Sequence, residues 1–385
     1  MRLKGFFWDS IERDPQKLKI LYDHQIFTTQ KYGGISRYFA ELISGMSNEK
    51  DLTNEVGIVY SGNEYLKALV PGYLYRFAQT GWKIERSFRK RVNCNKSIQL
   101  LKKGSFDLFH PTEFNPYFLD YIGKKPYVLT VYDMAHEKKP EFFFAVAGDN
   151  TTYNNYLADK KLLIQSAAHI ITISDTTKKD IVDILNIPAN SISTVYLGNS
   201  IKQHMAKNEP IISDPYLLFV GNRFGYKNFE VVLSAFSKFS KTRDSIKLVC
   251  CGGGPFTPEE VQTISALKVG DRVVWLNSQT DVGLATLYAH AKAFVFPSHY
   301  EGFGLPVIEA ASLGCPLILS DIPVFREIAG DVATYFNPLD DEELAAVMLN
   351  HFDTAHESGS LKEMSARFTW ERTCKSVYQI YTLIK

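Results

Sequence analysis

Short apolar segments of strand length recur along the whole chain and alternate with segments of helix length. Because strands separated by helices favour parallel pairing, this alternation predicts α/β architecture with doubly wound parallel sheets. The segments form two sets, which predicts two such sheets. The first set is Leu18–Tyr22, Val56–Tyr60, Phe106–Phe109, Tyr127–Val131, His169–Ile173 and Ile192–Tyr196. The second set is Tyr216–Val220, Ile246–Cys250, Arg272–Leu276, Ala293–Phe296, Pro316–Leu319 and Val332–Phe336.

The two sets divide the 385-residue chain into two Rossmann-like domains, as its length also suggests. The first domain is expected over residues 1–200, with an N-terminal arm at 1–17, and the second over residues 216–367. The polar stretch 201–215 has no clear periodicity and is interpreted as the linker. Since ligands of such sheets bind beyond the carboxyl ends of the strands, we expect the binding site in the cleft between the domains.

Composition and charge argue against several classes of function. Lys and Arg total 43 and Asp and Glu total 42, so a net charge of +1 gives no general attraction to nucleic acid. The five cysteines are scattered without metal-ligand spacing, which predicts no metal site and reduced thiols in the cytoplasm. No apolar run approaches the roughly 18–20 residues that span a bilayer, and the N-terminus turns acidic too early for a secretory signal. Any membrane contact is therefore expected to be peripheral, at the inner face.

The stretch Ser298–Gly314, SHYEGFGLPVIEAASLG, carries the strongest chemical signal. It leads from an apolar strand through a glycine-rich turn into a helix, with Glu301 in the turn and Glu309 inside the helix. Free N–H groups at a helix N-terminus suit a phosphate, and Gly302 and Gly304 let the backbone approach it closely. The two carboxylates would repel phosphate but can accept hydrogen bonds from sugar hydroxyls. The alternative is an ordinary strand–helix connection with a solvated Glu301 and a capping Glu309.

The segment Glu301–Ala310, EGFGLPVIEA, resembles the Glu-x7-Glu signature of the retaining glycosyltransferases of family 4, which have the GT-B fold. The resemblance implies that Glu301 contacts the donor sugar, that Glu309 holds the ribose of the nucleotide, and that the amides of Phe303, Gly304 and Leu305 meet the diphosphate. It also implies that the first domain binds the acceptor and the second the nucleotide sugar, across the cleft. Residues 368–385 would form a last helix that crosses back to the first domain.

A glycine pair near the N-terminus is a second candidate seat for the diphosphate. Gly33 and Gly34 precede an amphipathic helix, and Arg37 lies in its first turn, where a cation is unfavourable for the helix itself and so suits a ligand. A plain glycine turn is the alternative. The position matches the glycine loop that closes over the donor diphosphate in the resembled family.

The segment Phe219–Asn228, FVGNRFGYKN, resembles the family's segment in which an arginine and a lysine neutralise the leaving diphosphate. The resemblance assigns that role to Arg223 and Lys227, which would act together with Glu301 in catalysis. Asn222 stands where the family often has arginine. Leu276, at the end of a later strand-like segment, is expected to lie at the edge of the nucleotide base.

Four residues at strand ends of the first domain are expected to bind the acceptor: His110, Tyr132, Asp133 and His136. Asp133 is also expected to take part in catalysis. The resembled family commonly has His-Asp where this chain has Tyr132-Asp133, so Tyr132 must act differently or His136 must substitute. A lone histidine is more often structural, and that is the alternative for both histidines.

Residues 82–103, WKIERSFRKRVNCNKSIQLLKK, contain eight basic residues and one acidic residue. Trp82, Phe88 and Val92 are interleaved with them, a pattern typical of a basic amphipathic surface segment. Such a segment would be attracted to anionic lipid or to a lipid-diphosphate acceptor. A solvated helix face is the alternative.

Taken together, the resemblance implies a retaining, metal-independent hexosyltransferase that needs no cofactor. The segments GNRFGYKNF and TVYDMAHE are similar to those of bacterial mannosyltransferases of surface-polysaccharide assembly. This favours GDP-mannose as donor and a saccharide or lipid-linked saccharide as acceptor, in lipopolysaccharide biosynthesis. The alternatives are a UDP-sugar donor and an inactive nucleotide-sugar-binding partner. A hydrolase with two carboxylates would leave the glycine loop and the cations unused, and the broken glycine motif at 251–256 disfavours a nicotinamide oxidoreductase.

Overall fold

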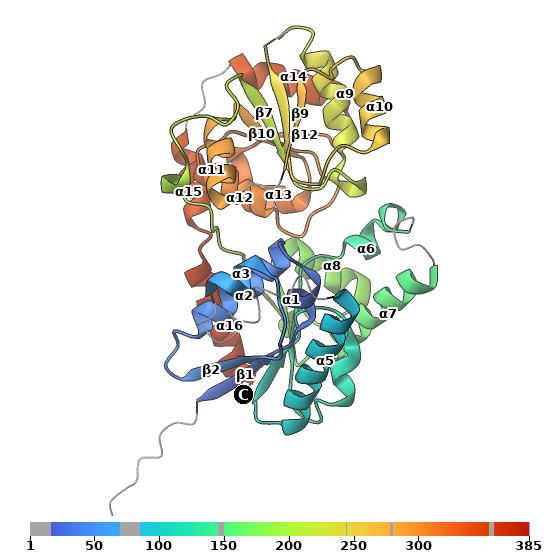
Figure 1. The fold of residues 1–385 in the computed structure, drawn as a ribbon, viewed down its shortest axis with the longest axis vertical. Coiled ribbons are helices and arrows are strands. Elements are labelled where there is room, and N and C mark those ends of the chain that lie inside the picture. Colours follow the sequence, from blue (N-terminus) through green and yellow to red (C-terminus); the bar gives the residue numbers. More distant parts are fainter. Residues whose placement is uncertain are drawn as a thin grey trace, which may run out of the picture.

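The structure, a computed structural model, describes residues 17–69, 85–144, 150–243, 245–277, 280–353 and 358–384. Two α/β units, one from each half of the chain, lie one above the other in Figure 1. Residues 1–16 of the predicted arm and 82–84 of the predicted basic segment lie outside the described residues.

The N-terminal unit contains only parallel strand pairs among its described residues. Its strands are β1 (Leu18–Tyr22), β2 (Leu52–Val56), β3 (Leu108–His110), β4 (Val128–Val131), β5 (His169–Thr172) and β6 (Ile192–Thr194). They form two three-stranded sheets with the orders β2-β1-β3 and β4-β5-β6. A single parallel bridge between Phe109 and Tyr127 joins β3 to the start of β4. The order along the unit therefore reverses between β1 and β3.

The C-terminal unit is built on one six-stranded parallel sheet with the order β12-β11-β10-β7-β8-β9. Its order reverses between β7 and β10. The strands are β7 (Tyr216–Val220), β8 (Lys247–Cys251), β9 (Val273–Leu276), β10 (Ala293–Phe296), β11 (Leu317–Ser320) and β12 (Thr334–Phe336).

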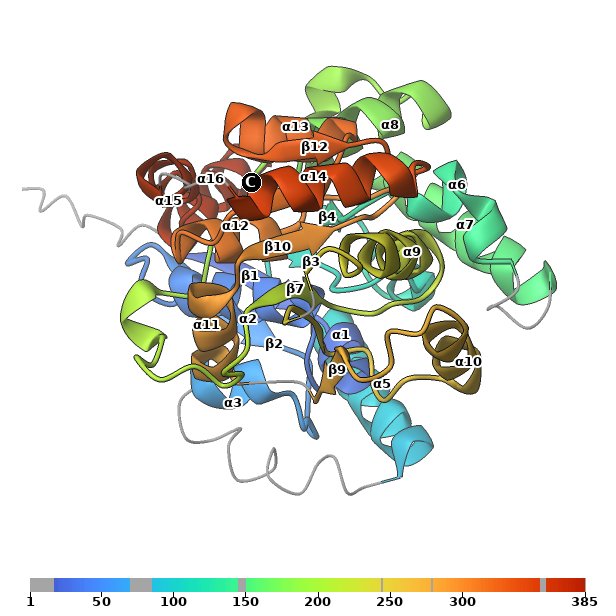
Figure 2. The ribbon, with the colours of Figure 1, turned by 90° about the horizontal axis from the view of Figure 1, so that it is seen from above.

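Helices pack on both faces of the sheets, as Figure 2 shows for the C-terminal unit. In the N-terminal unit they are α1 (Gln25–Thr29), α2 (Gly34–Met46), α3 (Glu64–Leu69), α5 (Arg86–Lys103), α6 (Ala135–Lys138), α7 (Asn150–Ser166) and α8 (Asp175–Leu185). The later helices are α9 (Phe229–Phe239), α10 (Pro258–Ala266), α11 (Asp281–His290), α12 (Leu305–Ser312), α13 (Pro323–Ala329), α14 (Asp341–Asp353), α15 (Ser358–Ala366) and α16 (Trp370–Ile384).

The two faces of the central strands of the C-terminal sheet are buried in different cores, which explains why these strands are continuous apolar runs in the sequence. In β7, Leu217 and Phe219 belong to a core with α9 and α14, whereas Tyr216 and Leu218 belong to the larger core on the other face. Alternate residues of a strand point to opposite faces, so a strand covered on both sides needs apolar residues throughout. The predicted α/β class with two doubly wound parallel sheets is confirmed.

The predicted strand Val56–Tyr60 is wrong, because β2 lies four residues earlier. This strand is at the edge of its sheet, so it has a polar exposed side and lacks the apolar run that marks a central strand. The apolar run leads out of the sheet instead. There the side-chain oxygen of Asn93 accepts hydrogen bonds from the N–H groups of Val59 and Tyr60, each at 2.9 Å.

The last helix, α16, packs on the N-terminal unit beside α2 (Figure 1). Its Tyr381 hydroxyl is hydrogen-bonded to the Tyr22 hydroxyl at 3.0 Å and to Nδ1 of His110 at 2.5 Å. The other ring nitrogen of His110 is bonded to the Thr130 hydroxyl at 2.9 Å. All four residues are buried, so this hydrogen-bonded chain attaches the helix to the centre of the N-terminal sheet without contact with water.

Removing the Tyr381 hydroxyl should therefore destabilise the fold. Tyr381→Phe leaves the Tyr22 hydroxyl and His110 with one partner fewer in a buried site, which costs roughly 1–3 kcal/mol. The free energy of unfolding in urea measures the effect. Tyr378→Phe, on the same helix at a partly buried position, is the matched control and should change stability little. Equal stability of the two variants would contradict the structural role of the chain.

Candidate active site

A cavity of about 230 Å³ lies between the two units, at the strand-order reversal of the C-terminal sheet. Residues that follow β7 and β10 line one side of it, and residues of the N-terminal unit line the other. Open parallel sheets bind ligands at such reversals, beyond the carboxyl ends of the strands. The lining residues are Gly34, Ile35, Tyr38, Tyr132, Asp133, Ile173, Leu197, Val220, Gly221, Lys227, Phe296, Glu301, Gly302, Phe303, Gly304, Leu305 and Pro306.

Glu301 and Lys227 form an ion pair in this cavity. The Nζ atom of Lys227, at the end of a short 3-10 turn after β7, lies 2.6 Å from Oε1 of Glu301. The Ser298 hydroxyl donates to the same oxygen at 2.7 Å. Burial, the largest single influence, would lower the pKa of Lys227, but the charges and hydrogen bonds of Glu301 and Tyr226 together outweigh it and the pKa is raised. Lys227 is therefore charged, and these contacts hold the pair in a fixed place before any ligand binds.

The turn between Glu301 and α12 requires glycine at two positions. A Cβ atom on Gly302 would lie 1.8 Å from the carbonyl oxygen of Tyr132, because the two units meet there backbone to backbone. Gly304, with φ of 96°, has the left-handed conformation that L side chains rarely adopt, and it caps the N-terminus of α12. Leu305 follows, and its side chain lies against Gly34 of the opposite unit. Free backbone N–H groups of this helix end thus border the cavity.

Glu309 lies one turn inside α12 and is buried. Its Oε1 atom is 3.8 Å from Nη1 of Arg37, and its Oε2 atom accepts a hydrogen bond from the Tyr288 hydroxyl at 3.3 Å. Burial raises the pKa of Glu309 to about 7, although Arg37 and Tyr288 lower it in part. The group is consequently poised between its neutral and charged forms near physiological pH.

Arg37 joins the two units. It stands in the first turn of α2, and its Nη2 atom lies 2.6 and 2.7 Å from the two carboxylate oxygens of Asp281 in α11. Its guanidinium also lies over the ring of Tyr65, 4.5 Å from the centroid. The unfavourable cation predicted in this helix turn is thus compensated by carboxylates of the C-terminal unit.

Two family models together match most of the chain. The one described as Glycosyltransferase Family 4 matches residues 32–201, and the one described as Glycosyl transferases group 1 matches residues 200–353. The chain belongs to this glycosyltransferase family. The predicted family resemblance is confirmed.

The named relatives match this chain over only part of their own length. The O-antigen chain mannosyltransferase RfbU of Salmonella typhimurium is 31% identical over 217 residues, which are 56% of this chain and 59% of that protein. The O-antigen chain mannosyltransferase B of Escherichia coli is 29% identical over 238 residues, which are 57% of this chain and 62% of that protein. The matched part is therefore less than two thirds of the length of these relatives.

Solved structures superpose on this glycosyltransferase over nearly its whole length. Sucrose-phosphate synthase of Thermosynechococcus elongatus superposes with a TM-score of 0.71 and 17% identity, over 96% of this chain and 99% of that one. HepE of Anabaena in complex with UDP and glucose gives 0.70 and 15%, over 95% and 99%. At these identities the likeness shows the fold, and the predicted GT-B fold is confirmed.

Arg223 does not reach the cavity of this glycosyltransferase. Its Nε and Nη2 atoms bond to the Glu260 carboxylate at 2.8 and 3.2 Å, and its Nη atoms donate to the carbonyls of Gly252, Gly254 and Pro255 at 2.9–3.0 Å. The guanidinium is occupied in holding the glycine turn after β8. Its expected contact with the diphosphate is not supported by this position.

Leu276 is the last residue of β9, the edge strand of the sheet, and does not line the cavity. The expected contact with the nucleotide base therefore has no support in the cavity lining.

Two of the four expected acceptor residues line the cavity and two do not. Tyr132 and Asp133 line the cavity. The Tyr132 hydroxyl is buried and has no hydrogen-bond partner among the described residues. His110 is fully buried and bonded at both ring nitrogens, so the expectation that it contacts the acceptor is wrong. His136 lies outside the cavity, stacked on Phe143 with ring centroids 4.0 Å apart.

Three partners of the site residues were not anticipated. Ser298 is three residues before Glu301, so its contact could have been inferred from the turn. Asp281 and Tyr288 lie far from Arg37 and Glu309 in sequence, and no local pattern could have paired them. Among the described residues no group of three or more His, Cys, Asp or Glu side chains is arranged to hold a metal ion.

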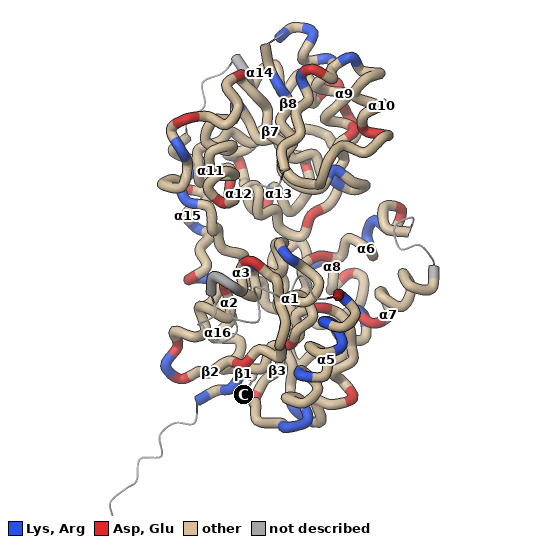
Figure 3. The backbone as a smooth tube through the Cα atoms, in the orientation of Figure 1, with Lys and Arg blue, Asp and Glu red and all other residues tan. Residues whose placement is uncertain are grey.

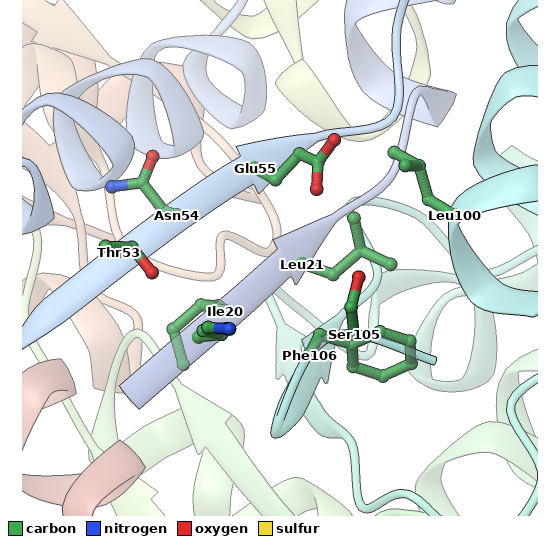
Figure 4. A pocket seen from close by; sticks show the side chains of 9 residues that line it. Ile20, Leu21, Thr53, Asn54, Glu55, Leu100, Ser105 and Phe106 are labelled. Carbon is green, nitrogen blue, oxygen red and sulfur yellow. The ribbon is translucent and has the colours of Figure 1, made fainter. Parts of the chain in front are cut away.

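A further cavity, of about 280 Å³, runs along β1 and β2 rather than beyond their carboxyl ends (Figure 4). Such a position on the flank of strands is not where open sheets bind ligands. Its lining residues are Lys19, Ile20, Leu21, Thr53, Asn54, Glu55, Leu100, Ser105 and Phe106.

Gly302→Ala should push the two units apart. The new methyl group would meet the Tyr132 carbonyl, a backbone atom that cannot rotate away, so the clash must be relieved by opening the cleft. Small-angle scattering should show a larger radius of gyration and thermal unfolding a lower midpoint. Gly359→Ala, at a helical position with open space around it, should leave both unchanged. Wild-type dimensions and stability in Gly302→Ala would refute the backbone contact.

Glu309→Gln should alter how stability depends on pH. The folded state holds the proton of Glu309 up to about pH 7 instead of 4.5, so its stabilising contribution is complete below pH 4.5 and is lost as the pH rises through 7. The wild type should therefore lose roughly 3 kcal/mol relative to the variant over this range, at about 1.4 kcal/mol per unit of pKa. Urea unfolding at several pH values measures the difference. Glu371→Gln, at an exposed position of α16, should show no such change.

Proposed function

We propose that this glycosyltransferase transfers a mannosyl residue from GDP-mannose to a saccharide or lipid-linked saccharide, with retention of configuration. The observation that carries the proposal is the Glu301–Lys227 pair inside the interdomain cavity, next to the amide-rich N-terminus of α12. A nucleotide sugar requires a carboxylate for its sugar hydroxyls, and a cation and free N–H groups for its diphosphate. The names of the relatives, O-antigen chain mannosyltransferases, support mannose and surface-polysaccharide assembly.

Each group in the site has a chemical task in this proposal. Glu309 accepts hydrogen bonds from the ribose hydroxyls, and the amides of Phe303–Leu305 and of the Gly33–Gly34 turn bind the diphosphate. Lys227 supplies the positive charge that a metal ion supplies in other transferases. Arg37 is already paired with Asp281 and Glu309, so the donor shares this cation with them.

The reaction breaks the bond between the anomeric carbon and the diphosphate oxygen and forms a bond to the acceptor oxygen on the same face. The acceptor proton passes to the departing phosphate oxygen, so no protein base is needed. Negative charge grows on the diphosphate as it leaves, and a cation already in place stabilises it without reorganisation. In this proposal Glu301 orients the sugar. Asp133, which lines the opposite wall of the cavity, accepts a hydrogen bond from the acceptor.

The basic helix α5 is proposed to hold the protein at an anionic membrane surface (Figure 3). Within the described part of segment 82–103, Phe88 is 52% exposed. Each basic residue near a charged bilayer contributes about 1 kcal/mol of attraction. None of the described helices has the length and apolar character needed to cross a bilayer. Exposed basic residues of the helix are Arg86, Lys90, Arg91, Lys102 and Lys103.

Nucleotide binding tests the donor site directly. GDP should raise the thermal unfolding midpoint in EDTA more than UDP, ADP or dTDP, because a ligand at 100 times its Kd stabilises by about 2.7 kcal/mol. Glu309→Ala should abolish the shift, since the ribose loses its carboxylate. Glu371→Ala, far from the cavity on α16, should retain it.

The alternative outcomes separate the parts of the proposal. A larger shift with UDP would keep a nucleotide-sugar transferase and overturn mannose as the sugar. A shift that needs divalent metal would overturn the proposal that Lys227 takes the place of a metal ion. No shift with any of the four nucleotides would overturn the donor site itself.

A further inference from the structure

A cavity of about 390 Å³ lies where the chain crosses from one unit to the other, and we call it the crossover cavity. Residues 194–196 at the end of β6 line one wall, Glu327 of α13 lines another, and residues 367–376 line the third. This last segment passes from α15 on the C-terminal unit to α16 on the N-terminal unit (Figure 1). The volume falls within the roughly 300–1,000 Å³ of small-molecule sites, so the cavity can hold a small organic ligand.

Two arginines, Arg367 and Arg372, determine the charge of the crossover cavity. In the part of the chain that the structure describes, neither guanidinium is paired with a carboxylate. Nε of Arg367 donates to the carbonyl oxygen of Met364 at 3.2 Å, and Nη1 of Arg372 donates to that of Arg367 at 3.0 Å. These bonds to carbonyls hold the guanidiniums in place, but they use only part of the five N–H donors of each and leave the charge unneutralised. Arg37 and Arg223, by contrast, are each paired with a carboxylate.

Glu327 also lines the crossover cavity, but its carboxylate already has other partners. It accepts the N–H groups of Asp175 and Thr176 at 2.7 and 2.9 Å and the Thr176 hydroxyl at 2.7 Å. The carboxylate of Asp175 accepts the Thr194 hydroxyl at 2.6 Å. Both acidic groups lie at the N-terminus of α8, where the partial positive charge of the helix compensates them. The charge of the two arginines is therefore the one that a ligand can neutralise.

The other lining groups complete a site for a phosphate with an organic part. Ser376 lies four residues after Arg372 on α16, so both side chains are on one face of the helix, and both line the cavity. Two guanidiniums and a hydroxyl suit the oxygens of a phosphate, which arginine can bind with two parallel N–H groups. The rings of Tyr196 and Phe368, packed edge to face with centroids 5.8 Å apart, provide apolar surface for the rest of the ligand.

We propose that the crossover cavity binds a small organic phosphate monoester, with its phosphate group between Arg367 and Arg372. Such a ligand contacts both units, so it favours the closed arrangement in which the donor cavity is complete. Because a ligand that prefers one arrangement shifts the population toward it, the phosphate monoester raises the affinity of the donor cavity for a nucleotide. The site itself is independent of the proposed transferase function, whereas this coupling rests on it.

Direct binding tests the site, with Lys375→Gln as the matched control for Arg367→Gln and Arg372→Gln. Lys375 is exposed on the same helix and carries the same charge, but it does not line the cavity. Both arginines are exposed as well, so replacing them leaves the core intact. The probes are glycerol 3-phosphate and mannose 6-phosphate, with mannose as the uncharged control. They are titrated into the full chain by calorimetry, at constant ionic strength and with excess GDP to fill the donor cavity.

At least one phosphate monoester should bind the wild type and Lys375→Gln. Each arginine variant should bind it at least about tenfold more weakly, because a hydrogen bond between charged groups is lost. Equal binding by Arg372→Gln and Lys375→Gln, equal binding of mannose, or no binding of either phosphate monoester by the wild type overturns the site.

The affinity for GDP, measured with and without the phosphate monoester that binds, tests the coupling. It should rise at least about fivefold in the wild type, the lower end of typical couplings between sites, and should not change in Arg372→Gln. An equal GDP affinity of the wild type under both conditions overturns the coupling. Failure of GDP to bind under either condition overturns the proposed donor site instead, and the titration of the arginine variants still decides whether the crossover cavity binds phosphate.

Discussion

The contact between the backbone of Gly302 and the carbonyl of Tyr132 determines how closely the two units approach each other at the interdomain cavity. Side chains at an interface can rotate to absorb a change, but two backbone segments cannot, so their approach fixes how far the units close. Hydrogen bonds close to this contact also hold the two units together. The Tyr300 hydroxyl, in the C-terminal unit, donates to Asp180 at 2.7 Å and accepts the Met134 N–H at 3.1 Å. Glu327 of α13 accepts two backbone N–H groups at the start of α8, at 2.7 and 2.9 Å, as a capping carboxylate does.

With the units closed, most charges of the cleft are screened from water and must be balanced by one another. Glu301 is paired within its own unit by Lys227, whereas Glu309 depends on Arg37 from the opposite unit. The second pair is longer, 3.8 against 2.6 Å, and it is the weaker-held carboxylate whose pKa rises to about 7. Protonation of Glu309 is therefore linked to closure, because a wider cleft removes part of the burial that raises its pKa and also the Arg37 charge that lowers it.

The sequence predicted which segments form this site better than it predicted how their charged side chains are paired. Strand ends, the glycine turn and the two carboxylates follow from local patterns, namely apolar runs, helix-breaking glycines and a helix N-terminus. Arg223 illustrates the limit, because a cation after a strand resembles a phosphate ligand until Glu260 and three carbonyls are seen around it. His110 is a second example. Its hydrogen bond to Tyr381 is seen only once α16 is found to pack on the first unit. Partners that lie between 29 and 271 residues away, as these do, leave no mark in a local pattern.

The two strand-order reversals of the molecule are equivalent in topology, but groups of different chemistry lie beside them. At the C-terminal reversal the chain offers backbone, a turn of glycines and the start of a helix, which suit a charged and compact diphosphate. At the N-terminal reversal it offers side chains, aromatic rings beside carboxylates and amides, over a larger volume. Backbone amides recognise phosphate wherever it occurs, whereas side chains can be exchanged without disturbing the sheet. The surface at the C-terminal reversal is therefore constrained by the backbone, whereas the surface at the N-terminal reversal can change by substitution of single side chains.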